Sequence, residues 1–495
     1  MSDTSSTEVK YPVTTRAFGL AIIVLSGLQL MVVLDGTVAN LALAPLQADL
    51  GLSDAGRNWV LTSYALAFGG LMLLGGRLGD AFGRKKMFLA GVVLFTIASL
   101  LCGLAINEAT LVAARALQGV GAAVASPTAF ALVATTFAPG PVRNQAIAIY
   151  AAMTGVGSIA GLIIGGALTE VSWRWIFLIN VPIGVVIVVL AVVSLQETVG
   201  AKLPLDVPGA ILATLGCTGV VLALSEGTEL GWTNPIVIVS LLAGLLFLGL
   251  FLLVERRADN PLLPFSLFGS RDRVATFVAI FFAGGVMFCL AAYVALFVQD
   301  ILGYSPLHAG LAFVPFAFGL GAAAFLASQL VTRIAPRWLI LSGAVIMVGW
   351  LMVSVATMNA DSSYFPGLFF PVIGIGFGVG LTVVPLPLCA IAGVSPTEIG
   401  PLTAIALVAQ TLGGPLALAV IGALVTSRTL SLGGISGPAT LMNDNQLDAL
   451  SSGYMFALFC CAVCAVVAGI AAVFIRFTPQ QVAQAQAAQE DVQKG

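Results

Sequence analysis

The sequence predicts an all-α protein whose chain crosses a membrane fourteen times, and three observations support this class. Hydrophobic residues make up 59% of the 495 residues and charged residues only 8%, whereas a soluble domain carries about a quarter charged residues. The mean hydropathy is +1.07. The chain also contains repeated apolar runs of roughly 20 residues, the length that a helix needs to cross the hydrocarbon core of a bilayer. Lipid is therefore the solvent that we expect around most of this chain.

Each apolar run predicts one spanning helix. The runs are 18–42, 58–78, 87–106, 109–136, 143–168, 174–195, 207–226, 234–254, 273–299, 307–331, 338–357, 364–391, 401–426 and 453–475. A polar segment precedes the first run and carries no signal-peptide cleavage pattern, so we expect the first helix to stay in the mature protein.

The basic residues predict the orientation of these helices. If the N-terminus is cytoplasmic, the inner side holds most of the 20 basic residues. They are Lys10, Arg16, Arg77, Arg84, Lys85, Lys86, Arg143, Lys202, Arg256, Arg257, Arg271, Arg273, Arg333, Arg337, Arg476 and Lys494. The outer side holds only Arg57, Arg174 and Arg428, while Arg115 lies within a span. This bias follows the positive-inside rule, so we expect both termini in the cytoplasm.

The runs also predict two six-helix bundles with two additional helices between them. We expect a cytoplasmic tail at 1–17, the N-terminal bundle at 18–200, the additional helices and linkers at 201–272, the C-terminal bundle at 273–477 and a second cytoplasmic tail at 478–495. The segment "GGRLGDAFGRKKMFLAG" in the first bundle is echoed by "ASQLVTRIAPRWLILSG" in the second. Parallel halves of this kind enclose a site near the bilayer midplane and rock around it.

Two ionisable residues, Asp35 and Arg115, lie deep within predicted spans. A charge at a helix centre costs about 2.5–3.5 kcal/mol on insertion scales and usually marks an ion or substrate path. Both lie at a depth of roughly 10 Å below the outer surface, at about 1.5 Å per residue, so they can pair if their helices are neighbours. A neighbouring cation weakens proton binding by a carboxylate and burial strengthens it. The pair can therefore take up a proton in one conformation and release it in another; a static ion pair that fixes helix packing is the alternative.

A short loop on the predicted inner side reads "GDAFGRKK" and contains Asp80, Gly83 and Arg84. Gly83 permits a tight turn, and Asp80 can accept hydrogen bonds from a nearby Arg or from a helix N-terminus. We expect this loop to act as a latch between the halves that breaks when they rock. Positive-inside charge alone explains the lysines of the loop but not an Asp among them.

Polar and aromatic side chains within the spans are candidates for a substrate cavity, and packing against helices or lipid is the alternative for each. They are Gln29, Gln118, Phe281, Phe288, Tyr293, Phe316 and Gln410. Glycines at four-residue spacing allow close contact between helix backbones. They include the pairs Gly157 with Gly161 and Gly376 with Gly380.

Several classes of function are disfavoured. The sequence contains no P-loop and a single histidine, so we expect no cofactor, no metal centre and an ion gradient as the source of energy. The net charge of −2 is not the basic net charge that is typical of a nucleic-acid-binding protein. No HExxH or GxSxG motif occurs, and therefore we do not expect an enzyme.

Four segments resemble the fourteen-helix drug:proton antiporter group of the major facilitator superfamily. They are "LDGTVANLAL" of its helix 1 motif (Asp35, Thr37, Asn40), "GGRLGDAFGRKK" of its loop 2–3 motif (Gly76, Asp80, Gly83, Arg84), "LVAARALQGVGAA" of its helix 4 motif (Arg115, Gln118, Gly119) and "SWRWIFLINVPIG" at the entry to helix 6. The resemblance covers nearly the whole chain. It implies the major facilitator fold, a location in the bacterial plasma membrane, and a place for Thr37 and Asn40 at the substrate cavity.

The chain departs from the group's pattern in places. "GSIAGLIIGG", which contains Gly157, Gly161, Gly165 and Gly166, has Leu162 where the helix 5 antiporter motif has proline. This replacement weakens the inference of antiport, while the glycines still predict helix packing. In the second-half copy of the loop motif, Thr332 replaces the Asp.

The leading prediction is therefore a proton-coupled efflux transporter that exports drugs or other lipophilic compounds by alternating access, with Asp35 and Arg115 as its coupling pair. An exporter or flippase of lipids or cell-envelope precursors is the alternative, since few charges lie within the spans. A non-transporting membrane sensor is a third reading, although an inert scaffold gains nothing from burying an ionisable pair. We expect small lipophilic molecules or lipids and the bilayer as partners, no nucleic acid, and a monomer.

Overall fold

The structure is a computed structural model that describes residues 15–137, 141–197, 206–227, 230–257, 269–331, 333–359, 362–394 and 396–482. All regular structure within these ranges is helical, and fourteen helices are long and apolar enough to cross a membrane. The predicted all-α class with fourteen spans is thus confirmed. Residues 1–14 and 483–495 of the predicted tails lie outside the described residues, as do 201–205, 228–229 and 258–268 of the predicted region 201–272, and Thr332.

The first bundle contains six spans built from seven helical segments. They are α1 (Thr15–Leu50), α2 (Asp54–Phe82), α3 (Arg84–Gly103), α4 (Glu108–Thr136), α5 (Pro141–Val171), α6 (Trp175–Leu178) and α7 (Asn180–Ser194). The short α6 and α7 follow each other as a single span, Trp175–Ser194.

The second bundle contains the last six spans, several of which are interrupted. Its segments are α10 (Arg271–Leu296), the π-helix η2 (Phe297–Ile301), α11 (Pro306–Ala312), α12 (Val314–Leu330), α13 (Pro336–Thr357), α14 (Tyr364–Gly367), α15 (Phe369–Val383), α16 (Pro385–Ala390), α17 (Pro396–Ser431), the 3-10 helix η3 (Ala439–Leu441) and α18 (Asp444–Val473). Prolines stand near the starts of α11, α12 and α16, where the missing N–H costs no intrahelical bond.

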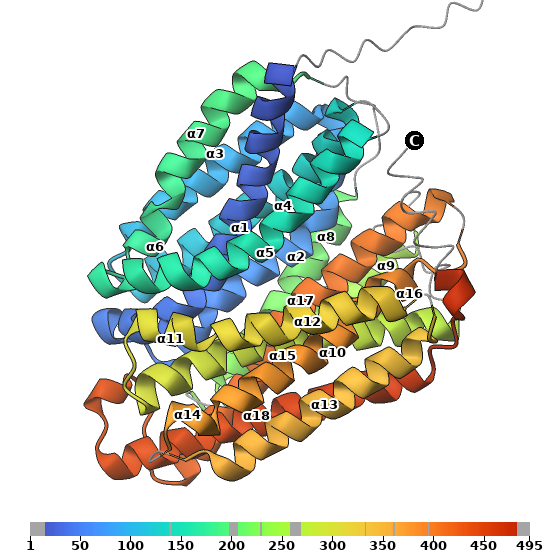
Figure 1. The fold of residues 1–495 in the computed structure, drawn as a ribbon. Helices are drawn as coiled ribbons and strands as arrows, with labels where there is room; N and C mark the ends of the chain where they lie inside the picture. The colour runs from blue at the N-terminus through green and yellow to red at the C-terminus, as the bar shows by residue number, and fades with distance from the viewer. Residues whose placement is uncertain are drawn as a thin grey trace, which may run out of the picture.

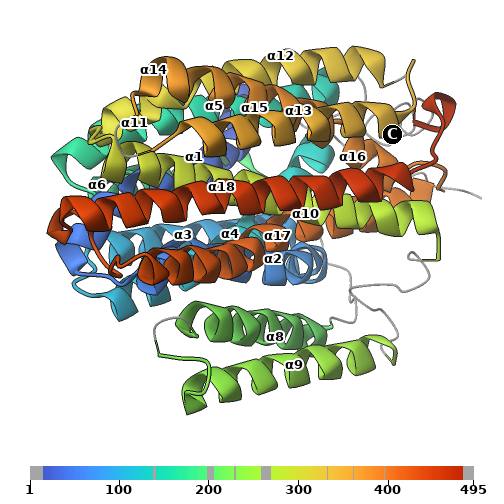
Figure 2. The ribbon, with the colours of Figure 1, turned by 90° about the horizontal axis from the view of Figure 1, so that it is seen from below.

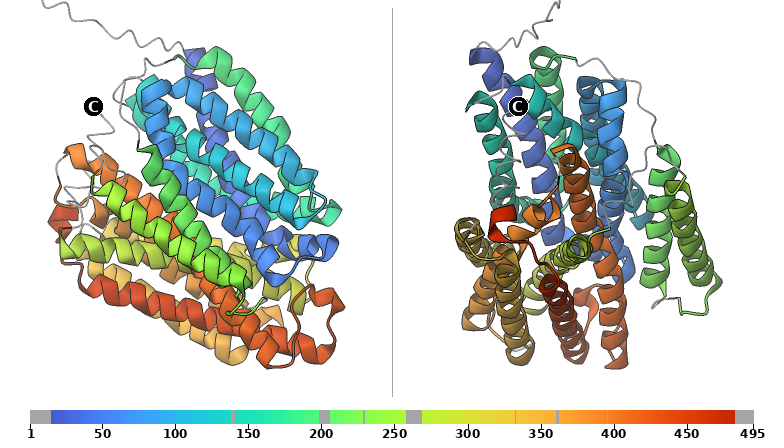
Figure 3. Two further views of the ribbon diagram at one scale, coloured as in Figure 1. Left: turned by 180° about the vertical axis from the view of Figure 1, so that it is seen from behind. Right: turned by 90° about the vertical axis from the view of Figure 1, so that its right-hand side faces the viewer.

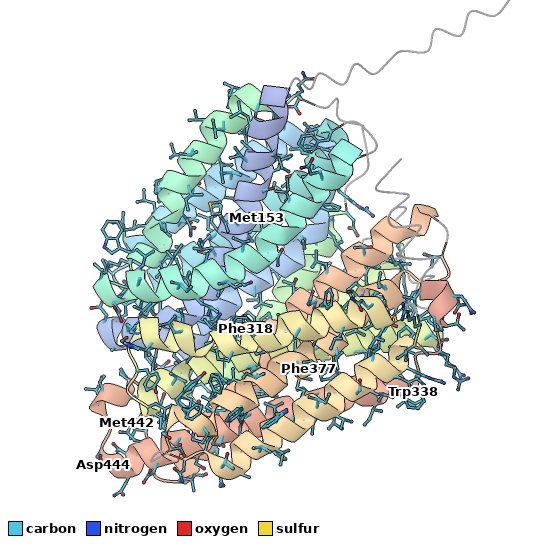
Figure 4. The ribbon with its side chains drawn as sticks, viewed as in Figure 1. Met153, Phe318, Trp338, Phe377, Met442 and Asp444 are labelled. Carbon is cyan, nitrogen blue, oxygen red and sulfur yellow. The ribbon has the colours of Figure 1, made fainter. Side chains whose placement is uncertain are left out.

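The two bundles lie against each other at one end and spread apart toward the other (Figure 1). The converged end holds α6 and α11, and the splayed end holds the start of α1. Figure 4 places Met442 and Asp444, near the start of α18, at the converged end and Trp338 at the opposite one. Figure 3 shows the same arrangement from behind and from the side.

The additional helices α8 (Val207–Glu226) and α9 (Pro235–Glu255) lie beside the two bundles (Figure 2). Helix α8 packs on α2 of the first bundle and on α17 of the second, whereas α9 packs on α8. At the contact with α2, a Cβ on Gly70 would collide with the Thr214 side chain. The pair therefore covers one of the seams between the halves from outside.

The predicted packing glycines lie at helix contacts. A Cβ on Gly161 would lie 2.9 Å from Thr37 Cβ, and one on Gly165 would lie 2.6 Å from Val38, so α5 packs closely on α1. Gly166 instead faces α11 of the other bundle, with a Cβ position 2.6 Å from Leu307 Cα. The contact of Gly166 is with backbone, which cannot move aside, so this position requires glycine, whereas Gly161 and Gly165 leave room for the Thr37 and Val38 side chains. Gly157 faces Val33 of α1, Gly376 faces Phe316 of α12, and Gly380 faces Leu320 of α12.

One predicted boundary is wrong at the converged end. Helix α2 begins at Asp54 rather than at 58, so Arg57 lies within its first turn, and the residue is only 2% exposed instead of belonging to an outer loop. Ser53 caps this earlier start by accepting a hydrogen bond from the Gly56 N–H at 3.1 Å, and such a cap favours helix initiation at that point. Hydropathy does not register a polar first turn that tertiary contacts bury.

Candidate functional site

A buried polar centre lies inside the first bundle. Asp35 of α1 and Arg115 of α4 form an ion pair with 2.6 Å between Oδ2 and Nη1, and both side chains are 1% exposed. The structure thus brings together the two deep ionisable residues of the sequence. Because both side chains are buried, each charge depends on its protein partners.

Further side chains complete a set of contacts that we call the coupling network: Ser99, Asp35, Arg115, Gln118 and Asn180. Asp35 Oδ1 accepts hydrogen bonds from Gln118 Nε2 at 2.7 Å and from Asn180 Nδ2 at 2.9 Å. Arg115 Nη1 donates to Gln118 Oε1 at 2.6 Å. Gln118 Nε2 also lies 2.9 Å from Ser99 Oγ. The network therefore joins α1, α3, α4 and α7.

Aromatic rings and backbone surround the guanidinium. Its carbon lies 4.4 Å from the centroid of the Tyr64 ring and 5.5 Å from that of Phe177, which favours the cation. Arg115 Nε donates to the Val60 carbonyl oxygen of α2 at 2.9 Å. Close helix packing makes this possible, since a Cβ on Gly119 would collide with the Tyr64 backbone. These contacts hold the guanidinium in place beside Asp35.

Two polar atoms beside the pair have no hydrogen-bond partner among the described residues. They are Asn180 Oδ1 and the Tyr64 hydroxyl, both buried. Buried polar groups are usually paired, so these atoms are available to a water molecule or to a proton held on Asp35. Asn180 and Ser99 are not among the residues predicted from the sequence, although Asn180 is an amide within an otherwise apolar span.

The loop predicted to act as a latch forms an ion pair within the first bundle. Asp80 at the end of α2 pairs with Arg84 at the start of α3, with 2.7 Å between Oδ1 and Nη2. Gly83 between these helices adopts a positive φ of 104°, which only glycine adopts readily. Gly76 lies against Pro127 of α4, at 3.5 Å from a built Cβ. A role for this loop in joining the halves stays a prediction.

The residues predicted to line a substrate cavity are dispersed. Gln118 and Tyr293 are buried against neighbouring helices, at 0% and 1% exposure, and their place at a substrate cavity stays a prediction. Gln118 belongs to the coupling network, and the Tyr293 ring packs on Tyr454, with 5.9 Å between centroids. A polar side chain within a span does not reveal whether it faces a cavity or a neighbouring helix.

Other candidates keep partial exposure. Gln29 Nε2 of α1 donates to Thr154 Oγ1 of α5 at 3.1 Å. Thr37 and Asn40 donate to backbone carbonyl oxygens of their own helix, at 2.8 Å and 3.0 Å. The rings of Phe281, Phe288 and Phe316 are half-buried.

Gln410 lines a cavity in the second bundle. The cavity has a volume of about 120 Å³ and lies between α10, α15, α16 and α17. Its lining is Ile280, Ala283, Val383, Leu386, Pro387, Thr403, Ala406, Leu407 and Gln410. Thr403 and Gln410 are the polar groups of this lining, and none of its residues is charged.

Twelve spans form two bundles, two additional helices lie beside them, and an ion pair is buried within the first bundle. This combination is typical of a multi-pass membrane transporter. The chain belongs to the Major Facilitator Superfamily, whose family model matches residues 25–418. It is 54% identical over 481 residues to the uncharacterized MFS-type transporter EfpA of Mycobacterium tuberculosis (strain ATCC 25618 / H37Rv), across 97% of this chain and 91% of that protein. It is 40% identical over 394 residues to the puromycin resistance protein pur8 of Streptomyces alboniger, across 79% of this chain and 78% of that protein.

Solved structures share the fold. A bacterial homologue of the human lysosomal transporter Spinster, in an inward-facing and occupied conformation, has a TM-score of 0.68 at 16% identity, across 97% of this chain and 99% of that chain. The protein is therefore a transporter rather than an enzyme, and it resides in the plasma membrane as its bacterial relatives do.

Proposed function

We propose that this protein is a proton-coupled exporter of lipophilic small molecules that works by alternating access. The buried Asp35–Arg115 pair carries the proposal. The Asp35 carboxylate is buried and is bound by one guanidinium and two amides. Its affinity for a proton changes when those groups move. Rocking of the halves supplies such movement.

Similarity supports export of drugs. The name of pur8 states resistance to puromycin, and removal of a compound from the cell is one way in which a membrane transporter confers resistance. The identity to the MFS-type transporter EfpA over nearly the whole chain supports a transporter of the same family.

The splayed arrangement fits one state of an alternating-access cycle. The predicted orientation places the splayed end, where α1 begins (Figure 1), on the cytoplasmic side. Arg84 and Arg337 stand at helix starts on that predicted side. A compound would therefore enter from the cytoplasm or from the inner leaflet in this state and leave from the converged end once that end opens.

One observation favours a lipid as cargo. The cavity around Gln410 carries hydroxyl and amide groups but no charge, which suits an uncharged or lipidic molecule better than a cation. Export of lipids or envelope precursors is therefore the second candidate function.

Transport in proteoliposomes with an imposed pH gradient tests both proposals. A lipophilic dye and a fluorescent lipid are compared as cargo, with the wild type and Asp35→Asn side by side. We expect gradient-driven flux in the wild type and none in the variant, because the amide cannot carry the proton; the preferred cargo selects between drug and lipid.

The matched control is Asp49→Asn on the same helix. Asp49 pairs with Arg174 at 2.8 Å near the surface of the first bundle, so its loss should leave the flux close to the wild-type level. Flux that ignores the gradient and survives Asp35→Asn would show that Asp35 is structural and that the coupling proposal is wrong.

A further inference from the structure

A second buried polar cluster lies at the converged end, outside the coupling network. We call it the closing network: Gln47, Asp54, Arg57, Asp300 and Tyr454. Gln47 comes from α1, Asp54 and Arg57 from the first turn of α2, Asp300 from η2 and Tyr454 from α18. Gln47, Asp54, Arg57 and Tyr454 are each at most 4% exposed, and Asp300 is half-buried.

The closing network connects the two bundles. Arg57 Nη1 donates to the Tyr454 hydroxyl oxygen at 3.3 Å, and the Tyr454 hydroxyl donates to Asp300 Oδ2 at 2.7 Å. On the first bundle, Gln47 positions both charges of α2: its Oε1 accepts from Arg57 Nη1 at 2.9 Å and its Nε2 donates to Asp54 Oδ1 at 3.0 Å. Separation of the bundles at this end must break the contacts of Tyr454 with Arg57.

The charges of this network do not balance. Asp54 and Asp300 are two carboxylates, and Arg57 is the cation between them, 3.5 Å from Asp54 Oδ1. Arg57 Nε and the nearby Tyr293 hydroxyl have no partner among the described residues. With both carboxylates ionised, the closed end therefore buries one excess negative charge, which is costly in a low dielectric.

The remaining neighbours do not correct the imbalance. Helix α10 contributes the neutral Tyr293, and Ser436, before η3, lies with its Oγ 3.4 Å from the Asp54 N–H. The segment η3 reads Ala-Thr-Leu and carries no ionisable group. Helix α11 carries His308, whose Nδ1 lies 2.8 Å from Ser305 Oγ and is engaged there.

Asp300 is the carboxylate that is better suited to take a proton. Asp54 lies in the first turn of α2, where the helix dipole favours a negative charge. Asp300 lies in the last turn of the continuous α10–η2 helix, where the dipole disfavours one. Its partial exposure also gives a proton a route to it.

We infer that Asp300 is a second proton-binding site, whose protonation favours closure of the converged end. Closing with a neutral Asp300 buries Asp54 and Arg57 as a balanced pair, and the Tyr454 hydroxyl can still donate to the carbonyl oxygen of the acid. Opening returns the ionised carboxylate to water. The inference rests on the proposed alternating access, and it assigns to Asp300 the sensing of acid at this end, separate from the proton exchanged at Asp35.

Distances between the two bundles at the converged end test this inference. Ile106 and Leu441 are 78% and 74% exposed and belong to different bundles, so both positions are suitable for spin labels. Attaching the labels to noncanonical amino acids avoids reaction with the native cysteines. Double electron–electron resonance on the full chain in nanodiscs, without cargo or gradient, is recorded between about pH 8 and pH 5. We expect the short distance to gain population as the pH falls, by up to about tenfold per pH unit for one proton.

Three variants decide the outcome. Asp300→Asn should hold the short distance at every pH, and Asp49→Asn should respond as the wild type does. Asp54→Asn removes the excess charge while keeping Asp300, so its pH response should weaken; this variant decides the matter if Asp300→Asn does not fold. A wild-type response in Asp300→Asn or in Asp54→Asn overturns the inference. This experiment measures distances and not transport. Its outcome can therefore be interpreted even if the gradient-driven flux of the proposed function is not found.

Discussion

At the scale of single residues, the coupling network holds two buried charges against each other. Asp35 receives hydrogen bonds from Arg115, Gln118 and Asn180, and charge-assisted bonds of this kind are the strong ones. The alternative to a proton-coupling role is a static pair that fixes helix packing. Stability and transport measured on the same variants separate these two roles.

Arg115→Gln should lower stability strongly, by about 3–5 kcal/mol, because it leaves a buried carboxylate without its cation. The double variant Asp35→Asn/Arg115→Gln should regain most of this loss, since no unpaired charge is left. Thermal unfolding in detergent measures both. We expect the double variant to stay inactive in gradient-driven transport; if it also regained transport, the pair would be structural only.

The sequence predicted part of this network for a physical reason. Charges within apolar spans are rare enough to be noticed, and equal depths made a pair of Asp35 with Arg115 possible. Asn180 and Ser99 escaped notice because neutral polar residues occur in many spans and their partners depend on helix rotation. Hydropathy assigned Arg57 to an outer loop, whereas tertiary contacts bury it, and the predicted span 273–299 ended before Asp300.

At the scale of helices, α5 is the element whose contacts decide how the halves meet. Gly161 and Gly165 bring it against α1 of its own bundle, whereas Gly166 brings it against α11 of the other bundle. Leu162 stands where related antiporters carry proline, and its carbonyl oxygen faces Gly310 of α11. The helix therefore retains a glycine-based contact across the halves without the proline.

Gly166→Val should prevent closure of the converged end. The new side chain would meet the Leu307 backbone of α11, which cannot move aside as a flexible side chain can. We expect the spin-label pair at Ile106 and Leu441 to report a longer distance at every pH, together with slower transport. Gly155→Val is the matched control, since nothing lies within 4 Å of a Cβ at Gly155 on the same helix; equal effects of the two variants would contradict the assignment.

The position of helices α8 and α9 against the two bundles was not specified by the predicted spans alone. The sequence predicted that they lie between the bundles in the chain, and the structure has α8 in contact with both α2 and α17. Their outward side is strongly apolar, with Leu242 and Leu246 of α9 61% and 59% exposed, as expected for a surface that faces lipid. Which seam they cover could not be read from periodicity, because helices that are apolar all round do not reveal their partners.

At the scale of the whole molecule, two polar centres lie at different levels of one fold. The coupling network lies within the first bundle, and the closing network joins the bundles at the converged end. The number of spans and the division into bundles follow from apolar length and charge bias, which are local properties. The state of the molecule, converged at one end and splayed at the other (Figure 1), depends on contacts between the bundles.

The central claim is that Asp35 exchanges a proton for cargo. The most direct test adds a lipophilic dye to the purified protein in weakly buffered detergent and follows released protons with a pH indicator. The account predicts proton release that saturates with the dye in the wild type and is absent in Asp35→Asn, while Asp49→Asn behaves as the wild type. Equal proton release from the wild type and Asp35→Asn, or dye binding without any release in the wild type, would contradict it.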